Sequence, residues 1–471
     1  MTGTDAKLGD YSGTSVTVMG LGLFGGGASV ARFFAERGAE VTVTDLRSAE
    51  VLAPAIAELE QLPLSWVLGE HREIDFQETD LVVANPAVPP RSPFLELARQ
   101  AGVPITSEMS LFIGGTRARL CAVTGTQGKS STCNLLTGLL LASNYSAYLG
   151  GNIGGSLLDR VDEFTSEDVV VLELSSYQLE ALALEPEAAR CFETVAILNI
   201  LEDHLARHGS VAAYAKAKCQ LLEHVAPGGT VLLPADDPQF ANWIATDATR
   251  IDFSQQADSA PLHQSATAFH LGSQTLAQLE DLRLPGQFQR VNALVALGMA
   301  HTLGVPADML GTALRTCRGL PHRLENLGVI GGRRIWDNAI STTPDSTVAA
   351  MLSLEPGFTL LLGGEAKGLG LEELARRAAA GAKHTICFGQ GAPEFHRALT
   401  AAGAACESAN TMHEAVGRAF ACTEPGQEIL FSPAAASFDA YPNFQARALD
   451  FRAAVRAQAG TARVKDQGNY A

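Results

Sequence analysis

The stretch AVTGTQGKSS, residues 122–131, follows the apolar run RLC and leads into the helix-like stretch STCNLLTGLLLAS. A strand, a glycine-containing loop and a helix in this order are the setting of a phosphate-binding loop. Gly125 and Gly128 let the backbone wrap around an anion, and the amides at the helix start carry the positive end of its dipole. Lys129 can then neutralise charge on the β- and γ-phosphates of ATP, and Ser130 can ligate Mg²⁺. The stretch therefore predicts an ATP-binding loop.

The spacing of this loop departs from the usual P-loop in one place. The usual spacing puts a glycine at position 123, where this chain has Val123. A glycine turn with a surface lysine is therefore the alternative, although the strand and helix on either side favour ATP binding.

The same alternation of strands and helices runs along the whole chain. It begins with SVTVMG, GASVARFFAERG and AEVTVTD, continues with DVVVLELSS and TVAILNI, and starts again near residue 320 with FTLLLGG, HTICFGQG and EILFSP. Alternation of this kind predicts an α/β protein with parallel sheets. Because 471 residues are too many for one core, we predict three domains. These are a Rossmann-like domain at 1–115, an ATP-binding P-loop domain at 116–317 and a second Rossmann-like domain at 318–471.

The composition excludes some classes of partner. The sequence has 34 Lys and Arg against 51 Asp and Glu, a formal net charge of −17. Such a surface repels nucleic-acid phosphates and anionic lipids, so we expect no nucleic-acid or membrane partner. The eight cysteines form no CxxC pair, the segment MTGTDAKLGDYSG lacks a signal-peptide profile, and no apolar stretch reaches bilayer length. We therefore expect a cytoplasmic enzyme with reduced thiols.

Further motifs follow one another along nearly the whole chain. They are GLGLFGGG (20–27), NPAVPPRSP (85–93), GGNIG (150–154), LELSSYQLE (172–180), LNILEDHLARHG (198–209), KAK (216–218), LPGQFQRVNAL (284–294), GLPHRLE (319–325), LLGGEAKG (361–368) and SPAAASFD (432–439). With TGTQGKS, they resemble the Mur ligase and folylpolyglutamate synthase group of ATP-dependent, amide-forming ligases. Within that group the chain is most similar to the Mur ligases that add glutamate to UDP-N-acetylmuramoyl-L-alanine. The resemblance implies a monomeric enzyme of peptidoglycan synthesis, and hence of cell-wall biogenesis, cell shape and cell division.

The chemistry of such a ligase explains the residue types. A carboxylate forms an amide only when hydroxide is replaced by a better leaving group, and ATP supplies one as an acyl phosphate. An amine then attacks through a tetrahedral intermediate. The site must hold the γ-phosphate and a carboxylate together, which requires basic side chains and divalent cations. Two Mg²⁺ ions are therefore implied.

The resemblance implies three further catalytic and metal-binding residues. Glu173, at the end of an apolar strand, would hold one Mg²⁺, although a plain strand-end carboxylate is the alternative. His204 would ligate or orient the second metal ion, although a lone histidine is more often structural. Lys218 would be carbamylated by CO₂ and so become an anionic ligand of the second Mg²⁺. Considered without the resemblance, Lys216 and Lys218 are ordinary solvated charges.

The resemblance also implies the residues that bind the three substrates. For ATP they are Gly125, Thr126, Gln127, Gly128, Lys129, Ser130, Ser131, Gln289, Asn292, Arg323 and Asp337, with glutamine at 289 a departure from the family's asparagine. For the UDP acceptor they are Leu23, Phe24, Asp45 and Arg47 near the uracil, Asn85, Pro86 and Ala87 near the diphosphate, and Asn152 and Ser175 near the muramoyl-alanine. For glutamate they are Thr342, Lys367, Ser437 and Phe444. Arg323 would reach phosphate only when the third domain closes.

Two other classes of function remain open. The glycines at 20, 22 and 25, with Asp45 further along, also fit a dinucleotide fingerprint, so an NAD-dependent oxidoreductase is an alternative. A non-catalytic nucleotide-binding protein is another. The loop at 125–131, with Glu173 and Lys218, favours the ligase, because a dehydrogenase needs none of them.

The match is weakest at residues 337–343. This chain has DNAISTT where most members have Asn-Asp-Ser-Lys-Ala-Thr-Asn, so Ile340 replaces a lysine and Asp337-Asn338 reverses the usual order. The loss of that lysine leaves the stereochemistry of the glutamate open. We predict D-glutamate, with an L-glutamate-adding ligase as the alternative.

Overall fold

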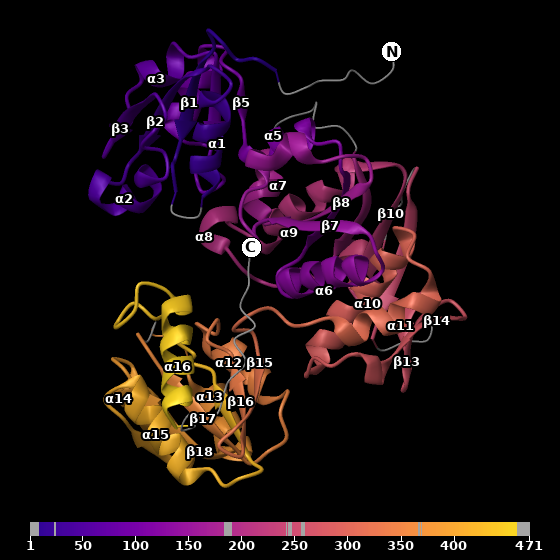
Figure 1. Cartoon of the computed structure of the whole chain (residues 1–471), viewed down its shortest axis with the longest axis vertical. Coiled ribbons are helices and arrows are strands. Elements are labelled where there is room, and N and C mark those ends of the chain that lie inside the picture. Colours follow the sequence, from indigo (N-terminus) through magenta and orange to yellow (C-terminus); the bar gives the residue numbers. More distant parts are fainter. Residues whose placement is uncertain are drawn as a thin grey trace. The chain divides into compact units, whose positions relative to one another are not determined.

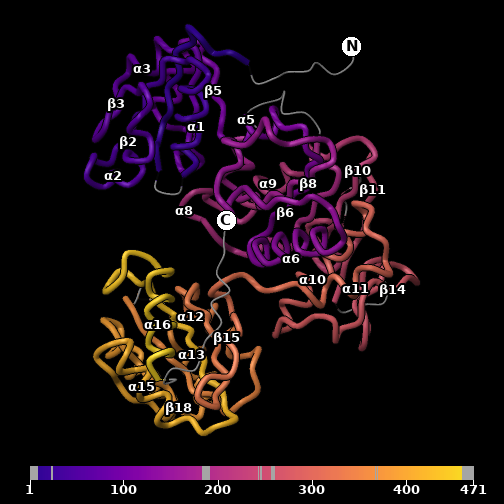
Figure 2. Tube along the Cα trace, in the orientation of Figure 1, coloured from indigo at the N-terminus to yellow at the C-terminus, as the bar shows by residue number. Residues whose placement is uncertain are grey.

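The computed structural model describes residues 9–22, 25–182, 191–241, 243, 247–255, 260–365, 368 and 370–458. The chain divides into two compact units, Met1–Arg283 with Arg290–Cys317, and Leu284–Gln289 with Arg318–Ala471. Three sheets run through them in sequence order (Figures 1 and 2). Within the part of the chain described, no helix is both long and apolar enough to cross a bilayer.

The first sheet is entirely parallel, with strand order β3-β2-β1-β4-β5. Its strands are β1 (Ser15–Met19), β2 (Glu40–Asp45), β3 (Leu64–Leu68), β4 (Leu81–Ala84) and β5 (Ile105–Thr106). The helices are α1 (Gly26–Ala35), α2 (Ala49–Ala57), α3 (Ile74–Gln77), α4 (Pro93–Gln100) and α5 (Glu108–Gly115). The strand order reverses at β1, between β2 and β4, and in such sheets ligands bind outside the carboxyl ends at that point.

The second sheet has nine strands, in the order β14-β13-β12-β11-β10-β9-β6-β8-β7. The parallel strands are β6 (Arg119–Thr124), β7 (Ser146–Gly151), β8 (Asp168–Glu173), β9 (Phe192–Ile197), β10 (Val225–Pro234), β11 (Thr249–Ser254) and β12 (Leu262–Gln264). The edge is antiparallel, through β13 (Ala268–Leu271) and β14 (Gln274–Gln278). Its helices are α6 (Lys129–Ala142), α7 (Ser176–Leu182), α8 (Leu205–His208), α9 (Val211–Cys219), α10 (Gln287–Thr302) and α11 (Ala307–Thr316). Because β6 lies between β8 and β9, the loops after β6 and β8 leave the sheet side by side.

The third sheet has the order β15-β16-β20-β17-β18-β19 and is parallel apart from the β15–β16 hairpin. Its strands are β15 (Glu325–Ile330), β16 (Arg333–Asp337), β17 (Phe358–Gly363), β18 (Ala382–Phe388), β19 (Cys406–Ser408) and β20 (Glu428–Phe431). Its helices are α12 (Pro344–Met351), α13 (Glu372–Gly381), α14 (Ala392–Ala401), α15 (Met412–Cys422) and α16 (Phe444–Gln458). The loops after β16, β20 and β17 therefore leave three adjacent strands at one edge.

The predicted α/β class with several mostly parallel sheets is confirmed. Strands β1, β6, β8 and β17 are almost wholly buried, as apolar strands covered by helices on both faces must be. The division into three domains with the ranges given above stays a prediction.

Candidate active site

The predicted phosphate loop connects β6 to α6. Gly128 has φ +88° and immediately precedes the helix. A Cβ atom at this position would lie 2.5 Å from Oδ1 of Asn292, which accepts a hydrogen bond from Thr132. Glycine is therefore required at 128 both by the backbone conformation and by the close approach of α10.

The amides of the loop bond to a neighbouring side chain in this structure, and their predicted contact with ATP stays a prediction. The N–H groups of Thr126 and Gln127 donate to the side-chain oxygen of Asn199, at 3.1 and 2.9 Å, and the Asn199 amide donates back to the Gln127 carbonyl. Tyr214 donates to the Thr126 hydroxyl. In this structure an anion would therefore meet the first-turn amides of α6, which have no acceptor within the helix.

Two lysines share one carbonyl oxygen of this loop. The ammonium of Lys129 donates to the carbonyls of Gly125 and Thr126, both at 2.9 Å, and the ammonium of Lys218 donates to the same Gly125 carbonyl at 2.7 Å. Lys218 is buried and its ammonium lies over the Tyr214 ring. Burial, and then the neighbouring charge of Lys129, lowers the pKa of Lys218 to about 7. Lys218 is therefore no ordinary solvated charge.

A buried carboxylate ends the strand next to the one that leads into this loop. Glu173 ends β8 in register with Val123 on β6, and its Oε1 accepts a hydrogen bond of 2.9 Å from Asn152. Its Oε2 is buried and has no hydrogen-bond partner among the described residues. Asn152 also donates its backbone N–H to the Glu173 carbonyl, so the turn after β7 fixes the direction of the carboxylate.

These residues fit the Mg²⁺ ions that the sequence implies. A buried carboxylate oxygen without a partner is the kind of ligand a divalent cation requires, and the buried hydroxyl of Ser131 is also unpaired within the described chain. Ser130 stands beside it at the start of α6. His204 lies further out, with a half-exposed ring that is 3.6 Å from the Asp203 carboxylate and next to Tyr177.

The predicted acceptor residues lie partly at the reversal point of the first sheet. Asp45 is buried; its carboxylate accepts from the Gly22 N–H and from the backbone and guanidinium of Arg47. Burial alone would raise the pKa of Asp45, but the hydrogen bonds from Arg47 and Gly22 lower it below its ordinary value. Asn85 donates to the Gly20 carbonyl from the other side of the crevice. Leu23 and Phe24 lie outside the described residues.

No role was predicted for Arg207, although its side chain contacts several segments of the first unit. Its guanidinium donates to the carbonyls of Pro86, Ala87 and Val88, pairs with Glu180, and lies over the Tyr177 ring. Arg207, Pro86, Val88, Tyr177 and Glu180 line a small pocket between β4 and α7. Two predicted diphosphate contacts, Pro86 and Ala87, thus have their carbonyls already bonded.

Ser175 has a local role. Its hydroxyl and N–H donate to Gln178, whose own N–H donates back to the hydroxyl at 3.3 Å. This is a capping arrangement at the start of α7. The predicted contact of Ser175 with the acceptor would have to form while Ser175 also caps α7.

The predicted glutamate residues lie at the shared edge of the third sheet. Thr342 follows β16, Ser437 follows β20 and Phe444 begins α16; Lys367 lies outside the described residues. Arg447, which is fully buried on α16, joins these loops by donating to the carbonyls of Ala339, Gly363, Ala435 and Ala436. Burial lowers the pKa of Arg447 to about 10, still well above neutrality. Arg447 therefore places a permanent positive charge beneath the loops.

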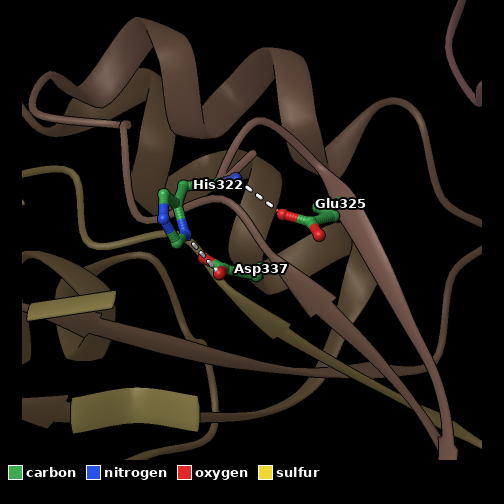
Figure 3. A group of neighbouring side chains, drawn as sticks. All are labelled: His322, Glu325 and Asp337. Carbon is green, nitrogen blue, oxygen red and sulfur yellow. Dashed lines mark hydrogen bonds and ion pairs between the residues drawn. The ribbon is translucent and has the colours of Figure 1, made fainter. Parts of the chain in front are cut away.

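The predicted ATP contacts outside the loop lie on α10 and near β16. Gln289 and Asn292 are both buried on α10. Asp337 is fully buried, and together with His322 and Glu325 it offers three ligand atoms within 4.8 Å (Figure 3). The guanidinium of Arg452 already fills this cluster, donating to Asp337 at 2.8 Å and to Glu325 at 2.5 Å. The cluster therefore contains its own cation and needs no metal.

Comparison with known proteins gives the family. Residues 14–107 match the Mur ligase MurD-like N-terminal domain and residues 123–300 match the Mur ligase middle domain. A protein of Roseiflexus sp. (strain RS-1) named UDP-N-acetylmuramoylalanine--D-glutamate ligase is 35% identical over 94% of this chain and 98% of its own length. A protein of the same name from Geobacter metallireducens is also 35% identical, over 95% of this chain and 98% of its own.

Solved structures show the same fold at lower identity. UDP-N-acetylmuramate-alanine ligase MurC from Thermotoga maritima superposes with a TM-score of 0.60 at 18% identity, covering 94% of this chain and 99% of its own. MurF ligase from the same organism, solved in complex with ADP, has a TM-score of 0.57 at 15% identity, covering 89% of this chain and 96% of its own.

Proposed function

We propose that the chain, which belongs to the Mur ligase family, adds D-glutamate to UDP-N-acetylmuramoyl-L-alanine at the expense of ATP. ADP and phosphate are the other products, and the reaction is a step of peptidoglycan synthesis. Support comes from the full-length similarity to D-glutamate ligases at 33–35% identity. The chemistry of the loop agrees with a ligase and offers nothing that a hydride transfer would need.

One observation carries the proposal: two lysines donate to one carbonyl of the loop after β6, and Glu173, at the end of the neighbouring strand β8, keeps one buried carboxylate oxygen without a partner among the described residues. Lys129 binds the phosphates of ATP when it leaves its loop carbonyls, and the first turn of α6 adds backbone amides. The acceptor carboxylate takes the γ-phosphoryl group and becomes an acyl phosphate. The amine of glutamate attacks it, and phosphate leaves from the tetrahedral intermediate.

Ser130, Glu173, His204 and a carbamylated Lys218 would hold two Mg²⁺ ions. When bound, Mg²⁺ neutralises the phosphate oxygens and so allows two anions to approach each other. The carbamate has a physical basis in this chain, because only a neutral amine reacts with CO₂ and the buried position beside Lys129 disfavours the ammonium of Lys218. Lys218→Ala is expected to lose activity and to regain part of it with added short carboxylates. Full activity without carboxylate would contradict the carbamate.

The substrate residues are proposed by the same similarity. ATP contacts are Gly125 to Ser131, Gln289, Asn292, Arg323 and Asp337; acceptor contacts are Leu23, Phe24, Asp45, Arg47, Asn85, Pro86, Ala87, Asn152 and Ser175. Glutamate contacts are Thr342, Lys367, Ser437 and Phe444. We also propose that the enzyme acts as a monomer in the cytoplasm, which sedimentation and cell fractionation would test.

The decisive experiment measures phosphate release from ATP and Mg²⁺ with UDP-N-acetylmuramoyl-L-alanine and either enantiomer of glutamate. We expect turnover with D-glutamate, loss of turnover in Lys129→Ala, and unchanged binding of the UDP acceptor by that variant. The exposed lysine of α9 gives a matched control, Lys216→Ala, which should keep wild-type turnover. Faster release with L-glutamate would overturn the assigned enantiomer, and full turnover of Lys129→Ala would overturn the loop assignment.

A further inference from the structure

The backbone on both sides of Arg323 is held in a conformation that ordinary residues avoid. His322 has φ +60° and Leu324 has φ +46°, both left-handed and neither a glycine. Such residues persist only where the surrounding structure holds them, and they concentrate at sites that position a functional group. The side chain between them is Arg323, the proposed phosphate contact.

Four hydrogen bonds hold the two residues in place. The N–H of His322 donates to Glu325 at 2.8 Å, and its carbonyl accepts from the Ile340 N–H at 3.2 Å. The N–H of Leu324 donates to the Asn338 side chain at 3.0 Å, and the His322 ring lies 2.8 Å from the Asp337 carboxylate. Both flanks of Arg323 are therefore fixed by Glu325 of β15 and by residues 337–340, at the end of β16 and just after it.

Arg452 connects the two carboxylates of this cluster, Asp337 and Glu325. It lies on α16, far along the chain, and its guanidinium bridges Asp337 and Glu325, with Nη2 3.1 Å from the His322 ring. Burial alone would lower the pKa of Arg452, but Asp337 and Glu325 raise it above its ordinary value. Without this cation, two buried or half-buried carboxylates would face each other beside the left-handed residues.

We propose that Arg452, through Asp337 and Glu325, is a positioning residue that holds Arg323 ready for the phosphates of ATP. The inference rests on the proposed function of Arg323. It also accounts for the reversed order at 337–338. Position 337 faces Arg452 and requires a carboxylate, whereas the Asn338 amide both accepts from Leu324 and donates to Ser432.

The test is a double-mutant cycle that combines Arg323→Ala with Arg452→Ala in the full chain. Arg452→Ala is expected to lower kcat/KM for ATP roughly tenfold, to leave KM for the UDP acceptor unchanged, and to have no further effect when Arg323 is already alanine. Arg456→Ala, one turn further along α16 and exposed, is the matched control and should retain wild-type kinetics.

The outcomes separate the two claims. Wild-type kinetics of Arg323→Ala would overturn the proposed role of Arg323 and the inference with it. The inference alone would be overturned if Arg323→Ala lowers kcat/KM for ATP while Arg452→Ala leaves it at the wild-type value. It would also be overturned if the effects of the two substitutions add in the double variant. If Arg452→Ala does not fold, the same cycle is run with Glu325→Gln, which keeps the side-chain shape and weakens the ion pair, and the same criteria apply.

Discussion

The buried amine of Lys218 makes stability depend on pH in a defined direction. Its pKa falls from an ordinary 10.5 to about 7 in the folded chain, because burial and Lys129 both disfavour the ammonium. The unfolded chain therefore binds more protons between these two values, and stability rises with pH across that window. The cost of burying the charge is full below about pH 7 and disappears toward pH 10.5.

We expect Lys218→Met, which removes the charge, to stabilise the apo protein more at pH 6 than at pH 9, by roughly 2 kcal/mol. Urea unfolding in CO₂-free buffer measures the difference while keeping the wild-type amine free of carbamate. Lys216→Met, on the exposed face of the same helix, should show no such pH dependence. An equal gain at both pH values would show that Lys218 keeps an ordinary pKa.

A sequence motif can point to a single residue where one local segment supplies the chemistry. Lys129 and Glu173 were predicted from a loop and a strand end, and they lie at the start of α6 and at the end of β8. Their catalytic roles stay predictions. Asn199, Arg207 and Arg452 were not predicted, because each acts on partners dozens of residues away and carries no local signal. Their roles depend on tertiary contacts that no short pattern contains.

At the scale of elements, the loop after β6 depends on a glycine that precedes α6. Gly128→Ala would force a residue with a Cβ into φ +88° and place that atom 2.5 Å from Asn292. We expect it to lose ATP binding by more than tenfold, with the backbone strain alone costing about 1 kcal/mol. Titration with Mg²⁺-ATP and urea unfolding measure the two effects separately.

Gly102 provides the matched control for that variant. It has φ +76°, and a Cβ added there would meet nothing within 4 Å. Gly102→Ala should therefore lose only the stability that the backbone strain costs, and should keep wild-type affinity for ATP. Equal ATP affinities of the two variants would show that the contact between Gly128 and α10 has no part in nucleotide binding.

The alternation of strands and helices predicted central parallel strands such as β1, β6, β8 and β17, because each is an apolar run buried on both faces. It did not predict the strands β12, β13 and β14 at one end of the second sheet, which are three to five residues long. Such short strands bury few side chains, so their sequences carry little periodicity, and neighbouring strands decide their conformation.

At the scale of the whole molecule, each of the two compact units has apolar clusters of its own among the described residues. One cluster of buried residues runs through the first two sheets, and two further clusters lie around the third sheet, one of which Phe288 contacts from residues 284–289. Units with their own cores can unfold separately. Periodicity does not predict this grouping, because it marks individual elements and not which sheets share a core.

We therefore expect two transitions in differential scanning calorimetry. The acceptor residues Asp45, Arg47, Asn85 and Asn152 all lie in the unit that holds the first two sheets. UDP-N-acetylmuramoyl-L-alanine at a hundredfold excess over its Kd should stabilise that unit by about 2.7 kcal/mol and leave the other transition where it is. In Asp45→Ala the shift should shrink, because Arg47 and Gly22 lose the carboxylate that orders the crevice. One cooperative transition that moves as a whole with the acceptor would instead mean that the two cores are thermodynamically coupled.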